Sequence, residues 1–200
     1  MTIIGITGPT GSGKTVLTEY LSGKGLPTVD ADALYHSMLI PPSECLDAIA
    51  QAFGKDVISA DGSLDRQKLS SLVFNSPEAL ALLNATVLPR VIDRVRSLIA
   101  EYEANGHSAV VIDAPTLIES GFDKECTTVI SVIAERSLRT ERIIARDGIT
   151  RHKAEQRVAA QKSDGFYEAH SDHVLRNDGD ALALISQFEA LGLLKKEGDI

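Results

Sequence analysis

Short runs of apolar, mostly β-branched residues recur along the chain, and segments with apolar residues at helical spacing separate them. These runs lie at Ile3–Thr7, Pro27–Val29, Ala109–Asp113, Thr127–Ala134 and His173–Leu175. Runs that stay apolar instead of alternating are typical of strands buried on both faces of a parallel sheet. Because helical patterns connect the runs, the sequence predicts an α/β fold with a five-stranded parallel sheet and helices on both faces.

The residues between the first run and the first helical segment form a phosphate-binding loop. Positions 8–15 read Gly-Pro-Thr-Gly-Ser-Gly-Lys-Thr, which is the pattern G-x-x-x-x-G-K-[ST] in its expected setting between strand and helix. Glycines let backbone N–H groups converge on a polyphosphate, and the start of the helix adds partial positive charge. The motif therefore predicts binding of a nucleoside triphosphate by Gly11, Ser12, Gly13, Lys14, Thr15 and Val16. Lys14 is expected to contact the β- and γ-phosphates and the Thr15 hydroxyl to bind Mg²⁺.

A long interval between Val29 and Ala109 does not fit a simple connection, since a crossover between neighbouring strands requires only about a dozen residues. Its pattern predicts helices at Ser43–Phe53, Asp65–Phe74 and near Pro77–Asn105, and no strand. We therefore expect a single kinase domain, 1–200, with a core at 1–30 and 108–200 and an inserted helical lobe at about 31–107 that binds the phosphate acceptor. The alternative is that these helices merely thicken the helical layer of the fold.

Carboxylates that are candidates for chemistry follow two of the predicted strands. Asp30 and Asp32 are two residues apart, so in extended backbone they project to the same side, at the strand end that opens onto the ligand crevice. We expect one to accept the proton of an acceptor hydroxyl and the other to cap the helix near Ala33; the alternative is that both only stabilise the helix dipole. For Asp113 the sequence leaves two roles open, contact with Mg²⁺ through water or capping of the next turn. The role of Glu119 is equally open.

A segment at about 135–165 carries more basic than acidic residues within an acidic protein. Three of its arginines fall at i, i+3 and i+7 and share one helical face: Arg139, Arg142 and Arg146. Asp147-Gly148 predicts the end of this helix and Thr150 the N-cap of a second one. Such a hairpin is typical of a lid that closes over phosphates and excludes water. The alternative is a solvated helical face.

Composition narrows the class of protein further. A chain of 200 residues that is 44% hydrophobic and 24% charged is ordinary for one globular domain. Cys45 and Cys126 lie far apart without metal-ligand spacing, so we expect no disulfide scaffold and a cytoplasmic location. The net charge of −8 argues against nucleic-acid and membrane partners. We expect a monomer or a weak homo-oligomer.

Together these motifs resemble the dephospho-CoA kinase family. The resemblance extends from Ile3 to about Gly179 and rests on the phosphate-binding loop, the arginine helix, Gln161 and three short strings: Asp30-Ala31-Asp32, Gly62-Ser63-Leu64-Asp65-Arg66 and Asp113-Ala114-Pro115. It implies a three-layer P-loop NTPase fold with a helical acceptor-binding insertion and a helical lid. It also implies Mg²⁺-dependent transfer of phosphate from ATP to the ribose 3′-hydroxyl of dephospho-CoA.

The resemblance implies roles for particular residues. It assigns catalytic roles to Asp32, Lys14, Arg142 and Arg146, with Asp32 as the general base. It assigns ATP binding to the phosphate-binding loop, to Arg142 and to Asn177 beside the adenine, although Asn177-Asp178-Gly179 also fits a plain turn. It assigns acceptor binding to Asp30, which supports Asp32, and to Asp32, Leu64, Asp65 and Arg66.

Three positions depart from the family pattern. Leu88 precedes Pro89 where a histidine is usual, Thr116 lies in a stretch that usually reads Pro-Leu-Leu-Phe-Glu, and Tyr167 replaces a basic residue. These departures concern the acceptor more than ATP, so another P-loop small-molecule or nucleoside kinase with a different hydroxyl acceptor is the alternative. A nucleotide-binding regulatory protein is a more distant one, because the chain lacks an Asn-Lys-x-Asp guanine-binding string.

Overall fold

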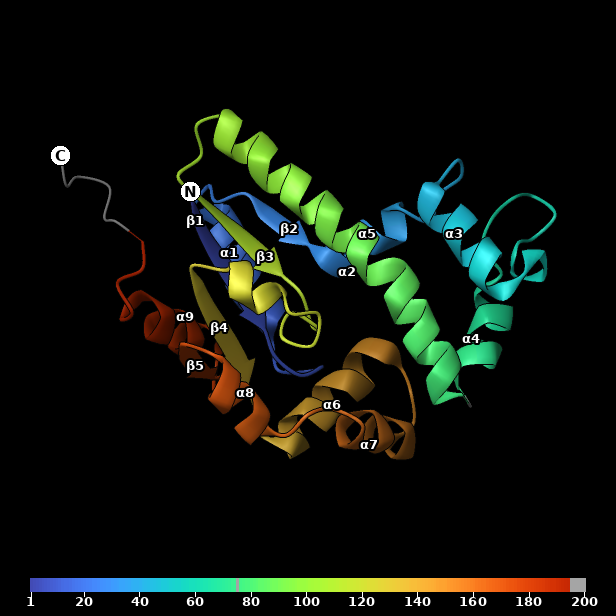
Figure 1. Cartoon of the computed structure of the whole chain (residues 1–200). Coiled ribbons are helices and arrows are strands. Elements are labelled where there is room, and N and C mark those ends of the chain that lie inside the picture. Colours follow the sequence, from blue (N-terminus) through green and yellow to red (C-terminus); the bar gives the residue numbers. More distant parts are fainter. Residues whose placement is uncertain (75, 195–200) are drawn as a thin grey trace. The chain divides into compact units, whose positions relative to one another are not determined.

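The computed structural model of the chain describes residues 1–74 and 76–194 (Figure 1). The strands are β1 (Thr2–Thr7), β2 (Thr28–Asp30), β3 (Ala109–Asp113), β4 (Thr128–Ile133) and β5 (His173–Arg176). The helices are α1 (Lys14–Gly23), α2 (Ala31–Ser37), α3 (Glu44–Phe53), α4 (Arg66–Phe74), α5 (Pro77–Ala104), α6 (Arg136–Asp147), α7 (Arg151–Ala159), α8 (Asp164–His170) and α9 (Ala181–Glu189). The chain divides into two compact units, which we call the sheet unit (Met1–Thr28 with the described residues from Gly106 onward) and the helical unit (Val29–Asn105).

The strands follow the order β2-β3-β1-β4-β5, and the pairs that β1 makes with β3 and β4, and β4 with β5, are parallel. In these registers Ile6 of β1 lies opposite Asp113 of β3 and Ile130 of β4. The Val111 N–H donates to the Pro27 carbonyl at 2.8 Å, where the chain enters β2. The predicted five-stranded parallel sheet is confirmed, and its central strand β1 leads directly into the phosphate-binding loop.

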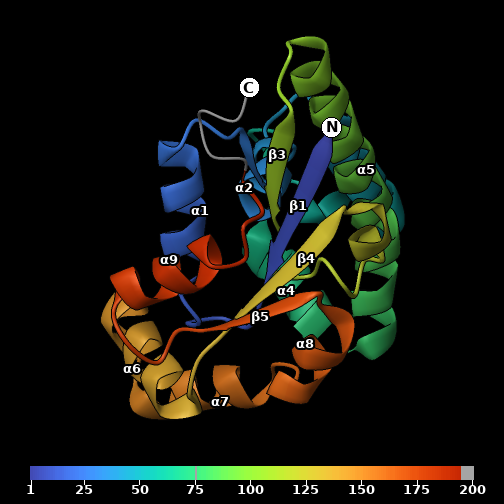
Figure 2. The same ribbon diagram turned by 90° about the vertical axis from the view of Figure 1, so that its left-hand side faces the viewer.

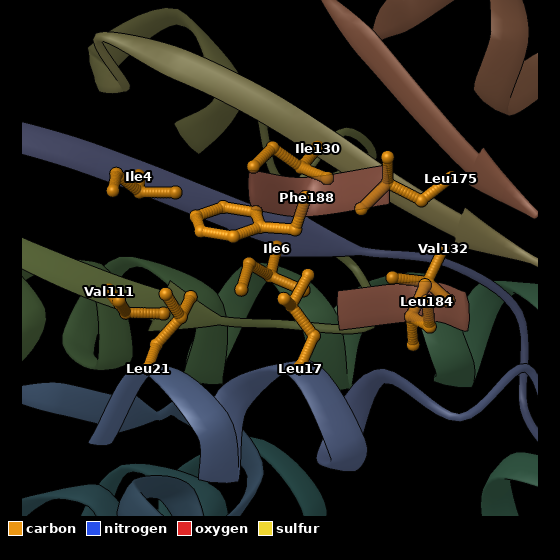
Figure 3. Packing of buried hydrophobic residues seen from close by; sticks show 10 residues of the cluster. All are labelled: Ile4, Ile6, Leu17, Leu21, Val111, Ile130, Val132, Leu175, Leu184 and Phe188. Carbon is orange, nitrogen blue, oxygen red and sulfur yellow. The ribbon is translucent and has the colours of Figure 1, made fainter. Parts of the chain in front are cut away.

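Helices cover both faces of the sheet, because alternate residues of each strand point to opposite sides. On one face the strands pack against α1 and α9 (Figures 2 and 3), in a cluster of fully buried side chains: Ile4, Ile6, Leu17, Leu21, Val111, Ile130, Val132, Leu175, Leu184 and Phe188. On the other face Ile133, the neighbour of Val132, packs with Tyr167 of α8. The three-layer α/β fold predicted from the sequence is therefore confirmed.

Helices α6 and α7 form the predicted hairpin and lie side by side (Figures 1 and 2). Gly148 ends α6 in the left-handed conformation (φ 63°), and the Thr150 hydroxyl accepts a hydrogen bond from the Lys153 N–H at the start of α7. Buried Ile143 of α6 packs with Ala154 and Val158 of α7. Both predicted signals, the glycine stop and the threonine cap, are confirmed, and the hairpin has an apolar core of its own.

In the helical unit, α3, α4 and α5 match the predicted helices to within one residue. Serine side chains cap two of them, Ser43 for α3 and Ser76 for α5. Between α3 and α4 the chain forms one isolated antiparallel bridge, Ile58 with Leu64. Within the described residues, no helix has both the length and the apolar character needed to cross a bilayer.

The predicted geometry of Asp30 and Asp32 is wrong. They were expected to share one side of an extended strand, but α2 already begins at Ala31, so Asp32 lies in the first helical turn. Asp30 is the N-cap, and its Oδ1 accepts a hydrogen bond from the Ala33 N–H at 2.9 Å. The capping half of the prediction is thereby confirmed for Asp30, while Asp32 is exposed in the first turn of α2.

The core predicts a sharp difference between two leucines. Leu17→Ala removes a fully buried side chain from the α1–sheet cluster, so the free energy of unfolding should fall by about 2–5 kcal/mol. Leu182→Ala in α9 removes a side chain that is 73% exposed and should change that free energy by no more than about 0.5 kcal/mol. Urea denaturation followed by circular dichroism measures both. Equal losses would show that the sheet–α1 layer is not the core.

Candidate nucleotide-binding site

The phosphate-binding loop connects the central strand to α1 without a side-chain cap. Gly13 is the N-cap of α1, has φ 91° in the left-handed region and makes no side-chain capping bond. The first turn of α1 therefore presents backbone N–H groups, with the positive end of the helix dipole, to an anion. The Thr15 hydroxyl lies in this turn, on an exposed residue. A hydroxyl oxygen is a hard ligand of the kind that Mg²⁺ prefers, so Thr15 fits the predicted metal role.

The carbonyl groups of the loop are bound by Lys14 of the loop itself and by two side chains from distant parts of the sheet unit. Arg139 Nε donates to the Thr10 carbonyl at 3.0 Å, and Asn177 Nδ2 donates to the Ser12 carbonyl at 2.8 Å. Lys14 Nζ donates to the Gly8 carbonyl at 2.9 Å. These donors lower the negative potential at the loop, because each neutralises part of a carbonyl dipole, and they help the loop to hold a polyphosphate.

Arg142 binds two further groups at the same place. Its Nη1 lies 3.4 Å from both the Gly11 and the Ser12 carbonyl oxygens, and its Nη2 donates to the Asn177 carbonyl at 3.0 Å. The side chain thus joins α6, the loop and the segment after β5. Its predicted contact with ATP stays a prediction, and the guanidinium lies directly against the loop that would hold the phosphates.

Asn177 packs directly against the loop, a contact that the sequence did not predict. The side chain is 4% exposed, and a Cβ atom placed on Gly13 would lie 2.1 Å from its Nδ2. Its backbone N–H donates to the Ile133 carbonyl at 2.8 Å, which fixes the residue at the end of the sheet. The amide nitrogen is used to support the loop, and the predicted contact with adenine stays a prediction.

Arg139 is a buried cation, 1% exposed, and the sequence assigned it no specific ligand. Burial lowers the pKa of its guanidinium, while the nearby Asp164 and Tyr167 raise it in part. Arginine stays protonated even so, because its ordinary pKa is far above neutrality. A permanent charge is thus placed beneath the Thr10 carbonyl.

Arg146, the third arginine of the predicted face, does not contact the loop in this structure. Its Nε and Nη2 bind the two carboxylate oxygens of Asp147 at 2.7 and 3.1 Å, and Arg157 Nη1 binds Asp147 at 2.5 Å. The hydrogen bonds and charge of these arginines, Arg146 first, lower the pKa of the Asp147 carboxyl. Arg146 is 61% exposed at its side chain, so it is held at the surface of the hairpin.

Two further residues from the sequence analysis lie in the sheet unit, Asp113 at the end of β3 and Tyr167 on α8. Asp113 lies opposite Ile6, and the Thr7 hydroxyl donates to the Pro115 carbonyl at 3.2 Å. Both roles predicted for Asp113 remain predictions. Tyr167 is buried, and burial, with the nearby Glu119 carboxylate, raises the pKa of its phenol to about 12. A neutral hydroxyl therefore lies at the position where the family pattern has a basic residue.

The predicted acceptor residues lie in the helical unit. Asp65 Oδ1 accepts from the Lys68 N–H at 2.9 Å and so caps α4. Leu64 and Arg66 line a cavity of about 220 Å³, together with the apolar side chains Leu69 and Val73. A mixed lining of this kind suits a ligand with both apolar and anionic parts.

Sequence reasoning missed the support of the loop by Arg139 and Gln161. Gln161 Oε1 accepts a hydrogen bond from the Thr10 N–H at 3.2 Å. These residues follow the loop by more than a hundred positions, and no local pattern relates them to it. The only signal was the family resemblance, which included Gln161 without a role.

The central strand, the glycine loop and the uncapped helix together define a P-loop kinase fold. The dephospho-CoA kinase family model matches residues 2–183, and the chain belongs to that family. The chain is 35% identical over 188 residues to the dephospho-CoA kinase of Corynebacterium efficiens, covering 94% of each protein. The family and enzyme class predicted from the sequence are confirmed.

Solved structures share this fold. The crystal structure of TT1252 from Thermus thermophilus superposes with a TM-score of 0.80 at 31% identity, covering 96% of this chain and 98% of that one. The dephospho-CoA kinase of Campylobacter jejuni superposes with a TM-score of 0.68 over 99% of this chain and 98% of that one. At 19% identity the second comparison supports the fold alone.

The loop packing predicts different outcomes for two glycines with nearly the same φ angle. Gly11 and Gly121 have φ 77° and 78°, so alanine at either costs roughly 1–2 kcal/mol of strain. A Cβ on Gly11 would also lie 2.8 Å from the Arg139 carbonyl oxygen, whereas nothing lies within 4 Å of one on Gly121. Gly11→Ala should therefore weaken ATP binding at least about tenfold, and Gly121→Ala by less than about twofold.

Isothermal titration with ATP measures both affinities, and thermal denaturation reports the strain that the two variants share. Equal ATP affinities in the two variants would mean that contact between the loop and α6 does not shape the nucleotide site.

Proposed function

We propose that this protein transfers the γ-phosphoryl group of ATP to the ribose 3′-hydroxyl of dephospho-CoA, giving coenzyme A and ADP. The observation that carries the proposal is the phosphate-binding loop in a chain that belongs to the dephospho-CoA kinase family. The carbonyl groups of this loop accept hydrogen bonds from Arg139 and Asn177. The family match does not favour a different acceptor or a regulatory role. Phosphoryl transfer needs an oriented acceptor, cationic groups at the phosphates and a carboxylate to take a proton.

Asp32 is the proposed general base. Its carboxylate is exposed in the first turn of α2, and its neighbour Asp30 is already engaged as the helix cap. We assign the proton of the attacking 3′-hydroxyl to Asp32 and the stabilisation of the developing phosphate charge to Lys14, to Arg142 and, once it leaves the ion pair with Asp147, to Arg146. Asp30 contributes by fixing the turn that carries the base.

Mg²⁺ is the proposed cofactor, bound with ATP. Thr15 is the side chain of this chain that would hold it, at the start of α1, and the ion would offset negative charge on the β- and γ-phosphates. The loop N–H groups and Lys14 orient the same phosphates.

The acceptor is proposed to bind in the helical unit. The cavity lined by Leu64 and Arg66 combines apolar surface with a guanidinium, and dephospho-CoA combines the methyl and methylene groups of its pantetheine chain with a diphosphate. Arginine suits phosphate because its planar donors bind two oxygens at once. Asp65 caps the helix that carries Arg66 and so holds it at the cavity.

A cytoplasmic location and a monomeric or weakly oligomeric state are also proposed. Cys45 and Cys126 are free thiols, which are typical of a reducing compartment. Sedimentation at micromolar concentration would measure the oligomeric state.

The role of Asp32 predicts a selective loss of turnover. Asp32→Asn should lower kcat by about 10²–10⁴-fold and leave ATP affinity nearly intact, because the amide cannot accept the proton. Asp47→Asn is the matched control, since Asp47 is likewise an exposed acid in the first turn of a helix, α3. Initial rates with dephospho-CoA and ATP titrations test both. Near-normal turnover of Asp32→Asn would remove it from the mechanism.

The role of Arg66 predicts a loss confined to the acceptor. Arg66→Ala should lower kcat/KM for dephospho-CoA by about 10–100-fold, the cost of a lost charged hydrogen bond, with the KM for ATP within about twofold. Arg94→Ala on α5, which removes an exposed ion pair with Glu101, is the control and should change neither value. A change in the KM for ATP that equals the change for dephospho-CoA would contradict the assignment.

A further inference from the structure

Thr10 is bound from outside the phosphate-binding loop at both of its backbone polar groups. Its N–H donates to Gln161 Oε1 at 3.2 Å, and its carbonyl accepts from Arg139 Nε at 3.0 Å. Neighbouring Gly11 is packed so closely against α6 that a Cβ would meet the Arg139 backbone at 2.8 Å. The first half of the loop is therefore fixed by contacts, not only by its own turn.

The two side chains that bind Thr10 come from opposite ends of one structural element. Arg139 lies in the first half of α6, and Gln161 lies two residues after the end of α7. The hairpin between them is held together by its own apolar core of Ile143, Ala154 and Val158. The Gln161 backbone N–H also donates to the Val158 carbonyl, so the glutamine is part of the end of α7. Thr10 thus joins the loop to the start of α6 and to the end of α7.

We propose that Gln161 is a positioning residue for phosphoryl transfer: with Arg139 opposite, it fixes the Thr10 backbone and so couples the ATP-binding conformation of the loop to the α6–α7 hairpin. Gln161 acts through the loop and does not touch the reacting atoms. The inference rests on the proposed use of ATP and adds a residue to which that function gave no role.

The chemistry of the Gln161 bond explains why an acceptor is required there. The Thr10 N–H is a partly buried donor, and an unsatisfied donor of this kind costs more than the bond itself contributes. Without the acceptor, the Pro9–Thr10 peptide would reorient towards water and disturb the N–H groups that follow it. A carboxylate can accept the same bond as the glutamine carbonyl, whereas an apolar side chain of similar size cannot.

The experiment compares Gln161→Leu, which removes the acceptor, with Gln161→Glu, which keeps it. In Gln161→Leu, kcat/KM for ATP should fall about tenfold, while the KM for dephospho-CoA stays within about twofold. Gln161→Glu should recover to within about threefold of the unaltered protein. Gln156→Leu is the matched control, because Gln156 is exposed on α7, and its kinetics should be unchanged.

Melting temperatures measured alongside separate positioning from general stability. A loss in Gln161→Leu that follows only the folded fraction, affects both substrates equally, or is not recovered by Gln161→Glu would overturn the proposal. If the unaltered protein binds ATP but does not phosphorylate dephospho-CoA, the proposed function fails instead, and ATP titration of the same variants still tests the role of Gln161.

A measurement on the unaltered protein covers the case in which Gln161→Leu does not fold. With a non-hydrolysable ATP analogue, hydrogen–deuterium exchange should slow both in a peptide covering 8–15 and in one covering 151–162. Slowing confined to the loop peptide would show that hairpin and loop are not coupled, and would equally overturn the proposal.

Discussion

A loop that binds a polyphosphate must turn its N–H groups to the ligand, and its carbonyls then need donors on the outside, since buried backbone groups are rarely left unpaired. This requirement organises the sheet unit. Arg139, Arg142 and Asn177 supply donors to the carbonyls of Thr10, Gly11 and Ser12. The central strand fixes where the loop starts, α6 carries the two arginines, and the end of β5 places the asparagine. The nucleotide site is thus held by the elements around it as much as by the motif.

Much of the fold could be predicted because its causes are local. The continuous apolar runs identified the strands to within one or two residues, since a strand buried on both faces has no polar alternation. Gly148 and Thr150 marked the turn between α6 and α7 because one tolerates the left-handed conformation and the other caps a helix. The motif at positions 8–15 predicted the loop because its conformation, too, depends on residues that are adjacent in the sequence.

The parts that could not be predicted depend on contacts across the chain. The spacing predicted that the three arginines share one helical face, but spacing does not show that Arg139 and Arg142 bind carbonyls while Arg146 binds Asp147. Likewise, the sequence after Asp30 fits both continued extended backbone and the start of a helix. Asp30 ends β2 and also caps α2 through the Ala33 N–H, so the helix already begins at Ala31. Such choices are decided by tertiary structure.

The sequence separation of these contacts has a consequence for biosynthesis. The loop is translated near the start of the chain, yet the side chains that bind it follow more than 120 residues later, and Asn177 follows Ser12 by 165. The parallel strand β4 that flanks β1 also arrives late. A nascent chain on the ribosome therefore cannot complete its nucleotide pocket until the segment through Asn177 has emerged. Until β4 has emerged, the central strand keeps one edge of unpaired backbone N–H and C=O groups, which favours association with other chains.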